Sequence, residues 1–227
     1  MNTAMAPSPN NPVSAPKKYQ EETILVVPTD QLRRVAPKTF STRTEEALSL
    51  VLADHGFLER NLAEHDESYK QVIPYVVIAH EGRFLLIRRT KKQGETRLHD
   101  MYSLGIGGHI NDMDLGMKTG HSHIVEVGMR RELTEEIRIE REESCKLVGI
   151  INDNSTEVAR VHVGFVYLLN TSSASFTIAE QDKYTANWKT PVEMAEHYPQ
   201  MESWAQIVYD YVVCGGAAER VKKWEGG

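Results

Sequence analysis

The sequence predicts an α/β protein whose sheet contains both parallel and antiparallel strands. Short runs rich in β-branched residues alternate loosely with stretches whose apolar residues recur at helical spacing. A hairpin between residues 72 and 89 makes two neighbouring strands antiparallel, so the sheet is mixed rather than purely parallel. The 227 residues suit one large domain, or one domain with an appendage.

Composition and charge restrict the classes of function. Apolar residues make up 41% of the chain and charged residues 26%, as in an ordinary globular protein. The formal net charge is −6, whereas a protein that grips nucleic acid through its phosphates needs a basic surface. We therefore expect no nucleic-acid partner. A small phosphate-bearing substrate stays compatible, because a bound cation can offset the repulsion.

Residues 1–20 are predicted to form a flexible tail, because Pro, Asn, Ser and Ala dominate them. They lack the apolar segment of a secretory signal, and no run approaches the ~18 apolar residues of a membrane helix. Cys145 and Cys214 belong to no C-x-x-C pair. Two free thiols are therefore favoured, with a disulfide between them as the alternative. Together these features predict a cytoplasmic protein without membrane contact.

The first predicted elements precede the hairpin. Thr23–Pro28 is a β-branched run closed by proline, which predicts a strand. Thr42 followed by Glu45 is a capping-box pattern that opens a helix, and Gly56 can close that helix as its C-terminal cap. A short polar helical stretch over residues 58–64 follows.

The hairpin is the clearest local signal in the sequence. Val72–His80 and Arg83–Arg89 are the predicted strands, and Glu81-Gly82 is the turn between them. The loop that follows, residues 88–94, is basic. A short charge run is usually solvated, and the alternative is that part of this one contacts a phosphate.

Strands and helices continue to alternate after the hairpin. Residues 102–110 predict a short strand that ends in a glycine-rich turn, and residues 111–120 predict a polar loop. A helix is predicted from Ser122 to Arg138, followed by strands over residues 147–151 and 161–169.

Two further helices are predicted near the C-terminus. Thr190, Pro191 and Glu193 supply a cap residue, a proline at the first helical position and an acid three residues after the cap. The last helix, closed by Gly215, carries apolar residues at three-to-four spacing, so we expect one face to pack on the core: Met201, Trp204, Ile207, Val208, Tyr211 and Val212.

The residues that carry chemistry lie on the predicted helix over residues 122–138. Glu132, Glu135 and Glu136 are spaced so that their carboxylates share one helix face. Three like charges in one patch repel one another, and a hard divalent cation removes this conflict. The cluster therefore predicts a site for Mg²⁺ or Mn²⁺, which prefer oxygen ligands.

Glycines surround this predicted site. Gly128 lies one turn before Glu132, although glycine inside a helix costs about 1 kcal/mol relative to alanine. Its missing side chain leaves room either for a ligand beside the carboxylates or for close packing, and both interpretations stay open. The turn Gly105–Gly108 precedes the helix and can present backbone groups to a ligand.

Gly108 and the segment Arg131–Glu136 together resemble the Nudix box, whose pattern is G-x5-E-x7-R-E-U-x-E-E-x-G-U with U aliphatic. The resemblance covers residues 71–213 and implies a Nudix-type α/β/α sandwich with a mixed sheet. Residues 21–70 would then form an N-terminal α/β extension, within a single domain over residues 21–227.

The chain departs from the box in three places. Gly108 lies 23 positions before Arg131 rather than 14, so the loop after Asn111 resembles an insertion of about nine residues. His123 stands where the family has its first glutamate. Arg138 stands where the family has its late glycine, while Ile139 still supplies the final aliphatic residue.

The resemblance implies roles for individual residues. Glu132, Glu135, Glu136 and the carbonyl of Gly108 would hold the metal, and Arg131 would pair with a carboxylate and fix the helix end. Among these, Glu132 and Glu135 are candidate catalytic residues. Family members often add an acid from a later loop, and Glu180 is the candidate here because it precedes Trp188 as that acid does in relatives; Glu157 and Asp182 are the alternatives.

The activity implied is metal-assisted hydrolysis of a diphosphate linkage in a nucleoside diphosphate derivative or similar small organic diphosphate, in which a glutamate takes a proton from the attacking water. One alternative is a ligand-sensing or interaction module that keeps the pocket, for which the change at His123 argues. Another is an enzyme similar to isopentenyl-diphosphate isomerase, against which the absence of a cysteine near the glycine turn argues. A homodimer is compatible with the resemblance.

Three histidines, His109, His121 and His123, lie around the predicted insertion. Histidines beside a surface loop are mostly incidental, and the oxygen-rich glutamate patch favours magnesium or manganese over a transition metal. A histidine that contacts substrate is the alternative. No substrate-binding residue is identified from the sequence.

Overall fold

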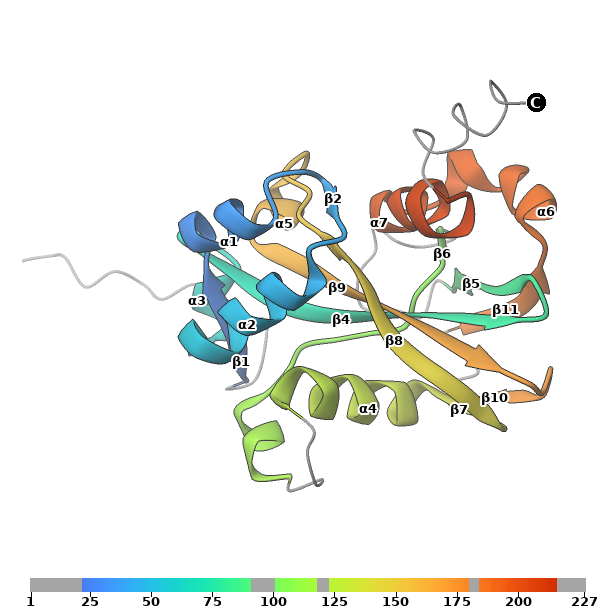
Figure 1. The fold of residues 1–227 in the computed structure, drawn as a ribbon, viewed down its shortest axis with the longest axis horizontal. Coiled ribbons are helices and arrows are strands. Elements are labelled where there is room, and N and C mark those ends of the chain that lie inside the picture. Colours follow the sequence, from blue (N-terminus) through green and yellow to red (C-terminus); the bar gives the residue numbers. More distant parts are fainter. Residues whose placement is uncertain (1–21, 91–100, 118–122, 180–183, 216–227) are drawn as a thin grey trace, which may run out of the picture.

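A computed structural model describes residues 22–90, 101–117, 123–179 and 184–215. Its described part contains a nine-stranded mixed sheet with helices on both faces (Figure 1). Along the sheet the order is β11-β5-β4-β9-β8-β2, with β1, β3 and β6 attached. The predicted tail over residues 1–20 lies outside the described residues.

Helices and strands follow one another along the described parts of the chain. In order, they are β1 Thr23–Pro28, α1 Thr29–Val35, β2 Phe40–Ser41, α2 Thr44–Asp54, β3 Gly56–Glu59, α3 Arg60–Ala63, β4 Tyr69–His80, β5 Arg83–Arg89, β6 Tyr102–Ser103, η2 Asp112–Gly116, α4 Ile124–Glu136, β7 Ile137–Ile139, β8 Glu142–Ile151, α5 Glu157–Arg160, β9 His162–Thr171, β10 Phe176–Ile178, β11 Tyr184–Lys189, α6 Pro191–Ala195, η3 Tyr198–Gln200, α7 Ser203–Val208 and η4 Tyr209–Val213.

The sheet is mixed, as the sequence predicts. β4 and β9 run parallel over nine residue pairs, whereas β5 is antiparallel to both β4 and β11. The hairpin turn consists of Glu81 and Gly82, which have φ angles of 47° and 74°. Two consecutive residues with positive φ match the right-handed twist of the strands that they join.

Two hydrophobic clusters lie on opposite faces of the sheet. On β4, Val76 and Ile78 belong to the cluster that includes α4, whereas Tyr75 and Val77 belong to the cluster that includes α7. Successive residues of a strand point to opposite faces, so one strand serves both clusters. Figure 1 shows α4 on one side of the sheet and α6 and α7 on the other, which confirms the predicted α/β/α sandwich.

The N-terminal segment belongs to the same sheet. β1 pairs antiparallel with both β3 and β4. The predicted capping box is wrong: α2 begins after Arg43 rather than Thr42 and has no side-chain cap. Gly56 does not cap α2 but begins β3, because its backbone pairs with Val26 of β1. Of the helical stretch predicted over residues 58–64, only α3 is helical.

Several short elements are absent from the sequence prediction. The helix α1 and the strands β7, β10 and β11 are new, and β8 is longer than the predicted strand. The polar loop after residue 111 contains η2. At the C-terminus, Thr190 and Glu193 form the predicted capping box at α6.

The last helix differs from its prediction. α7 is short and continues as one π-helical stretch, η4, and Met201 precedes both. Within η4, Tyr211 is 48% exposed, and its ring stacks on Phe40 at a centroid distance of 4.9 Å. Gly215 has a φ of 71° just beyond the helix end.

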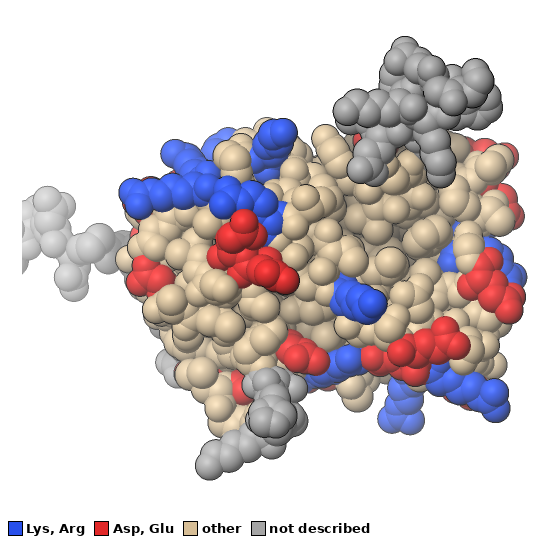
Figure 2. Space-filling model, viewed as in Figure 1, with Lys and Arg blue, Asp and Glu red and all other residues tan. Residues whose placement is uncertain are grey.

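The two cysteines, Cys145 and Cys214, are both unpaired. Within the described ranges, no helix is long and apolar enough to cross a membrane. On the face shown in Figure 2, basic side chains gather at the upper left over the N-terminal helices, with acidic ones beside them, and much of the remaining surface is uncharged.

Candidate active site

The helix α4 carries the glutamate cluster and is fixed to the sheet by its apolar side. Val125, Met129 and Leu133 are buried in the core, and they recur at helical spacing. His123 is the N-cap residue of α4, and its Nδ1 accepts a hydrogen bond from the backbone N–H of Glu126 at 3.2 Å. The residue at the place of the family's first glutamate therefore begins the helix.

Glu132 lies directly against Gly108 of the glycine turn. A Cβ atom at Gly108 would be 2.3 Å from Oε2 of Glu132, a separation that no side chain can adopt. Burial raises the pKa of Glu132 above its ordinary value. The glycine turn and α4 are thus in contact where the sequence predicts the metal, and a side chain at position 108 would displace the carboxylate of Glu132.

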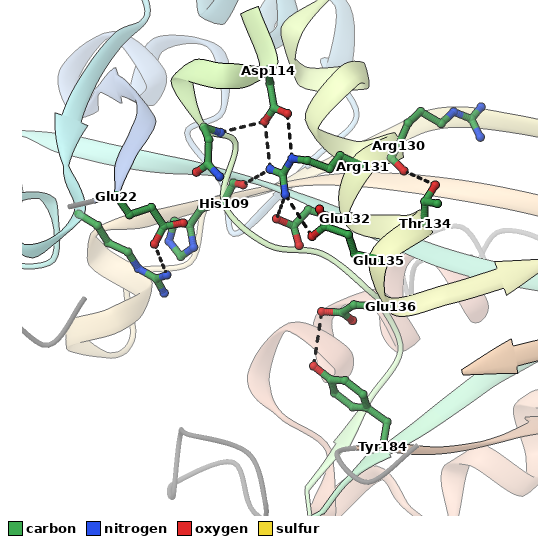
Figure 3. Close-up of polar contacts among 12 residues, drawn as sticks. Glu22, His109, Asp114, Arg130, Arg131, Glu132, Thr134, Glu135, Glu136 and Tyr184 are labelled. Carbon is green, nitrogen blue, oxygen red and sulfur yellow. Dashed lines mark hydrogen bonds and ion pairs between the residues drawn. The ribbon is translucent and has the colours of Figure 1, made fainter. Parts of the chain in front are cut away.

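Arg131 ties the helix to the segment that follows the glycine turn (Figure 3). Its Nε and Nη2 donate to the two carboxylate oxygens of Asp114 at 2.8 and 3.0 Å, and Nη2 also donates to the carbonyl of His109 at 2.9 Å. Its Nη1 donates to Glu132 at 2.8 Å. These hydrogen bonds, first those to Asp114, raise the pKa of Arg131. The guanidinium therefore holds Glu132 and the loop in one arrangement.

Asp114 was not predicted from the sequence to belong to the site. Its side chain is fully buried, and it also accepts a hydrogen bond from the backbone N–H of Asn111 at 2.9 Å. The apparent insertion is thus a structured segment that supplies the carboxylate partner of Arg131. The Asn-x-x-Asp spacing at residues 111–114 was the available sequence signal, because such a pair can close a turn.

Gly128 is explained by packing. A Cβ atom there would lie 2.8 Å from Cγ1 of Ile110 and 3.1 Å from Oδ2 of Asp114. Ile110 is wholly buried. Of the two interpretations of this glycine, close packing is the one that the structure shows, and the neighbour is the loop rather than the sheet.

Glu135 and Glu136 point in different directions. Glu135 is exposed, and its Oε2 lies 3.4 Å from Nη1 of Arg131. Glu136 is turned towards Tyr184, whose hydroxyl donates to its Oε1 at 3.4 Å (Figure 3). The three carboxylates therefore form a row along α4 and do not converge on one point. The guanidinium of Arg131 contacts both Glu132 and Glu135.

A narrow cleft with a volume of about 20 Å³ opens beside Glu136. It lies between β5, β11, the glycine turn and the end of α4. Apolar side chains form much of its wall, and its polar lining comes from Arg89, Ser103, Glu136 and Tyr184. The glutamate row thus ends at a concave surface, which is the usual setting of a small-molecule site.

A buried polar network supports the floor of this cleft. The hydroxyl groups of Tyr75 and Ser103 donate to Glu202 at 3.2 and 2.6 Å, and Nε of Arg89 lies 3.4 Å from the other oxygen of Glu202. The backbone of Ile106 exchanges two hydrogen bonds with Val76 of β4. The glycine turn is therefore fixed across the middle of the sheet.

The remaining predicted residues do not join this cleft. Glu180, Asp182 and His121 lie outside the described residues, and their roles stay predictions. Glu157 begins α5 and is exposed, and it does not line the cleft.

The two cysteines bear on the isomerase alternative. Cys145 lies on β8 and Cys214 follows η4. Neither lines the cleft, so the described part of the site offers no thiol for proton transfer.

Comparisons with known proteins place the chain among relatives of the same architecture. Protein YmaB of Bacillus subtilis (strain 168) is 32% identical over 201 residues, which is 84% of this chain and 97% of YmaB. The crystal structure of Tm1382, provisionally assigned as a Nudix hydrolase, matches with a TM-score of 0.71 and 32% identity, and the match covers 85% of this chain and 98% of Tm1382.

A more distant match is the Nudix domain of Shewanella oneidensis NrtR, solved with ADP ribose. Its TM-score is 0.48 at 15% identity, covering 67% of this chain and 88% of that domain. No protein-family model matches the chain.

Proposed function

Because the chain belongs to the Nudix hydrolase superfamily, we propose that it hydrolyses a diphosphate linkage in a nucleoside diphosphate derivative or a similar small organic diphosphate. One observation carries this proposal: the glutamate row on α4 lies against the glycine turn and ends at a cleft that contains an arginine. This arrangement combines oxygen ligands for a cation with positive charge for a phosphorylated ligand.

The residues present suit a hard divalent cation. The donor set consists of carboxylate oxygens and backbone carbonyls, the ligand type that Mg²⁺ and Mn²⁺ prefer. A Cβ atom at Gly108 would meet the carboxylate of Glu132, so the missing side chain leaves that carboxylate its position beside the glycine turn. Glu132, Glu135, Glu136 and the carbonyl of Gly108 would hold the ion once Glu135 and Glu136, which point in different directions, turn towards Glu132. When bound, it would neutralise phosphate charge and acidify a bound water.

The chain itself would supply positioning and proton transfer. Arg131 fixes the carboxylate of Glu132 through a hydrogen bond of 2.8 Å while Asp114 holds the guanidinium. Burial raises the pKa of Glu132 above its ordinary value, although the hydrogen bond from Arg131 opposes this shift, and a carboxylate with a raised pKa accepts a proton from water more readily. Glu132 is therefore the proposed general base among the described glutamates.

The cleft would bind the phosphorylated part of the substrate. The guanidinium of Arg89 lies 5.8 Å from the ring centre of Tyr184, and both residues line the cleft with Glu136. A guanidinium matches phosphate oxygens, and an aromatic ring offers a face for a planar group such as a nucleobase. Arg89 and Tyr184 are accordingly the proposed substrate-binding residues.

The direct test measures phosphate and nucleotide release with Mg²⁺ across a panel of diphosphate compounds. We expect turnover of at least one compound by the wild-type chain, and a loss of about 100-fold or more in Glu136→Gln, since a removed metal ligand weakens transition-state charge stabilisation. Glu126→Gln is the matched control, because it removes a carboxylate from the first turn of the same helix.

Two results would contradict the proposal. Turnover that survives in Glu136→Gln would show that the glutamate row does not carry the reaction. No turnover of any compound, with a diphosphate still raising the melting temperature of the wild-type chain, would instead support the ligand-sensing alternative. The helix-capping position of His123, in place of an acid, is the observation that keeps this alternative open.

A further inference from the structure

A second group of metal-ligating side chains lies on the other side of the glycine turn. It consists of Glu64, His109 and His162, and their ligand atoms all lie within 4.8 Å of one another. No other three His, Cys, Asp or Glu residues of the described ranges meet in this way. The three come from separate segments: Glu64 follows α3, His109 follows the glycine turn and His162 begins β9.

Hydrogen bonds orient the two imidazole rings. Nδ1 of His162 lies 2.7 Å from the carbonyl of Val158, which only accepts, so this nitrogen carries the ring proton and the lone pair resides on Nε2. Nε2 of His109 lies 2.7 Å from Oε1 of Gln71, so the side-chain amide of Gln71 holds the second ring in place. A ring whose second nitrogen donates to a carbonyl is the usual state of a metal-bound histidine.

The backbone around these rings is unusually well fixed. Gln71 of β4 is the sheet partner of His162 in β9, and the wholly buried Lys70 donates to the carbonyl of His162 at 3.1 Å. Gln71 is also fully buried, yet its Nε2 has no hydrogen-bond partner in the structure. A metal-bound water beside the cluster would supply an acceptor for this amide.

Two carboxylates and two cationic groups lie around the cluster. Arg60 lies 3.6 Å from Glu64 and 2.7 Å from Glu22, and Lys70 donates to the carbonyl of His162. Figure 3 shows the carbonyl of His109 accepting a hydrogen bond from Arg131, whereas its ring belongs to the second cluster. His109 therefore contacts Arg131 of the candidate active site through its backbone carbonyl and the second cluster through its ring.

We propose that Glu64, His109 and His162 bind a divalent transition-metal ion, with Zn²⁺ as the best match, at a site separate from the glutamate row. Two imidazole nitrogens and one carboxylate are an established ligand set for zinc that leaves a fourth position for water. Ligand atoms in a closed tetrahedral site lie about 3.4 Å apart. The partly exposed side chain of Glu64 can move to close the wider arrangement.

The test uses the full untagged chain, stripped of metal and kept in excess Mg²⁺, which occupies oxygen sites and binds imidazole poorly. Zn²⁺ is then titrated against a chromophoric chelator, and Co²⁺ binding is followed by its visible absorption. We expect one tightly bound Zn²⁺ per chain. His162→Ala and Glu64→Gln should abolish it, and Gln71→Leu should weaken it by about 10- to 100-fold, as expected for loss of a residue that orients a ligand.

Two control variants distinguish this site from Zn²⁺ binding elsewhere on the chain. His55→Ala removes a histidine whose Nδ1 also contacts the carbonyl four residues earlier, at 2.7 Å, and should leave Zn²⁺ binding unchanged. Glu136→Gln should leave it unchanged as well. Since Glu64 is partly exposed, Glu64→Gln stays informative if His162→Ala does not fold. Absence of stoichiometric Zn²⁺, equal weakening by His55→Ala, or loss in Glu136→Gln would each overturn the proposal.

Discussion

The Arg131–Asp114 pair shows how one buried contact organises the candidate site. Asp114 is fully buried, and the Arg131 side chain is 16% exposed. The pair joins the loop after the glycine turn to α4, and the same guanidinium holds Glu132. Removal of one partner from a buried ion pair leaves an uncompensated charge and is strongly destabilising.

We therefore predict that Asp114→Asn lowers the free energy of unfolding by about 3 kcal/mol and lowers turnover with it, as measured by urea unfolding and diphosphate hydrolysis. The control is Glu142→Gln, which disrupts an exposed two-bond pair with Arg130 at 2.6 and 2.8 Å. That change should cost less than about 1 kcal/mol. Equal losses in the two variants would mean that burial does not set the strength of the Arg131 pair.

Gly128 allows a second prediction at the scale of single residues. Alanine in a helix is favoured over glycine by about 1 kcal/mol, but its Cβ would lie 2.8 Å from buried Ile110. Overpacking costs about 1–3 kcal/mol, so Gly128→Ala should destabilise the chain by about 1 kcal/mol net in urea unfolding. In an Ile110→Ala background the same change should become stabilising. A stabilising effect in the wild-type background would show that Ile110 moves aside freely.

At the scale of elements, the start of α4 depends on a titratable cap. The hydrogen bond to the N–H of Glu126 requires an unprotonated Nδ1 on His123, and burial lowers the pKa of His123 below its ordinary value of 6.5. As pH falls, the unfolded chain therefore takes up this proton before the folded chain does. The contribution to stability is complete above about pH 6.5 and is lost as pH falls through the lowered pKa of the folded state.

We predict that His123→Asn, which keeps a capping side chain without titrating, loses less stability than wild type between pH 8 and pH 5.5. Melting temperatures at the two pH values measure this, and contributions of other histidines are common to both chains. His123→Ala should lose about 1 kcal/mol at pH 8 because the cap itself is removed. Identical pH dependence in wild type and His123→Asn would contradict the role of His123 as cap.

The strands β7, β10 and β11 were not predicted from the sequence, and the same physical reason applies to all three. β7, β10 and β11 are short and partly exposed, and β7 and β10 pair only with each other. Such strands carry little apolar alternation, so their pairing partners rather than their own side chains decide their conformation. The long strands β4 and β9 are buried along most of their length, and their apolar runs made them predictable.

At the scale of the whole molecule, the N-terminal segment is part of the fold rather than an addition to it. Leu25, Val27, Leu32, Ala47 and Val51 are almost fully buried in the cluster that includes α4. β1 also donates a backbone hydrogen bond from Leu25 to the carbonyl of Ile110. The same segment supplies Glu64 to the proposed zinc site.

We predict that a chain beginning at Gln71 does not fold. Burial of each large apolar side chain contributes about 1.5–3 kcal/mol to stability. The loss of several such side chains removes most of the 5–15 kcal/mol that separates a folded domain from its unfolded state. Circular dichroism and cooperative urea unfolding measure this. A chain beginning at Glu21 is the control and should unfold like the full chain, as the sequence predicts for a tail over residues 1–20. Cooperative unfolding of the shorter chain would show that residues 71–215 are independent.

The sequence by itself determined the mixed sheet, the hairpin, the helix that bears the glutamate row and the family resemblance. These features rest on local periodicity and on spacing within one helix, which are properties of neighbouring residues. Tertiary structure alone decided that Asp114 holds Arg131, that Gly128 faces Ile110 and that His109 meets Glu64 and His162. The partners in these contacts lie far apart along the chain or in a loop without periodicity. The pairing of β4 with β9 brings His162 beside Gln71, and the hydrogen bond from Leu25 to Ile110 fixes the loop against β1.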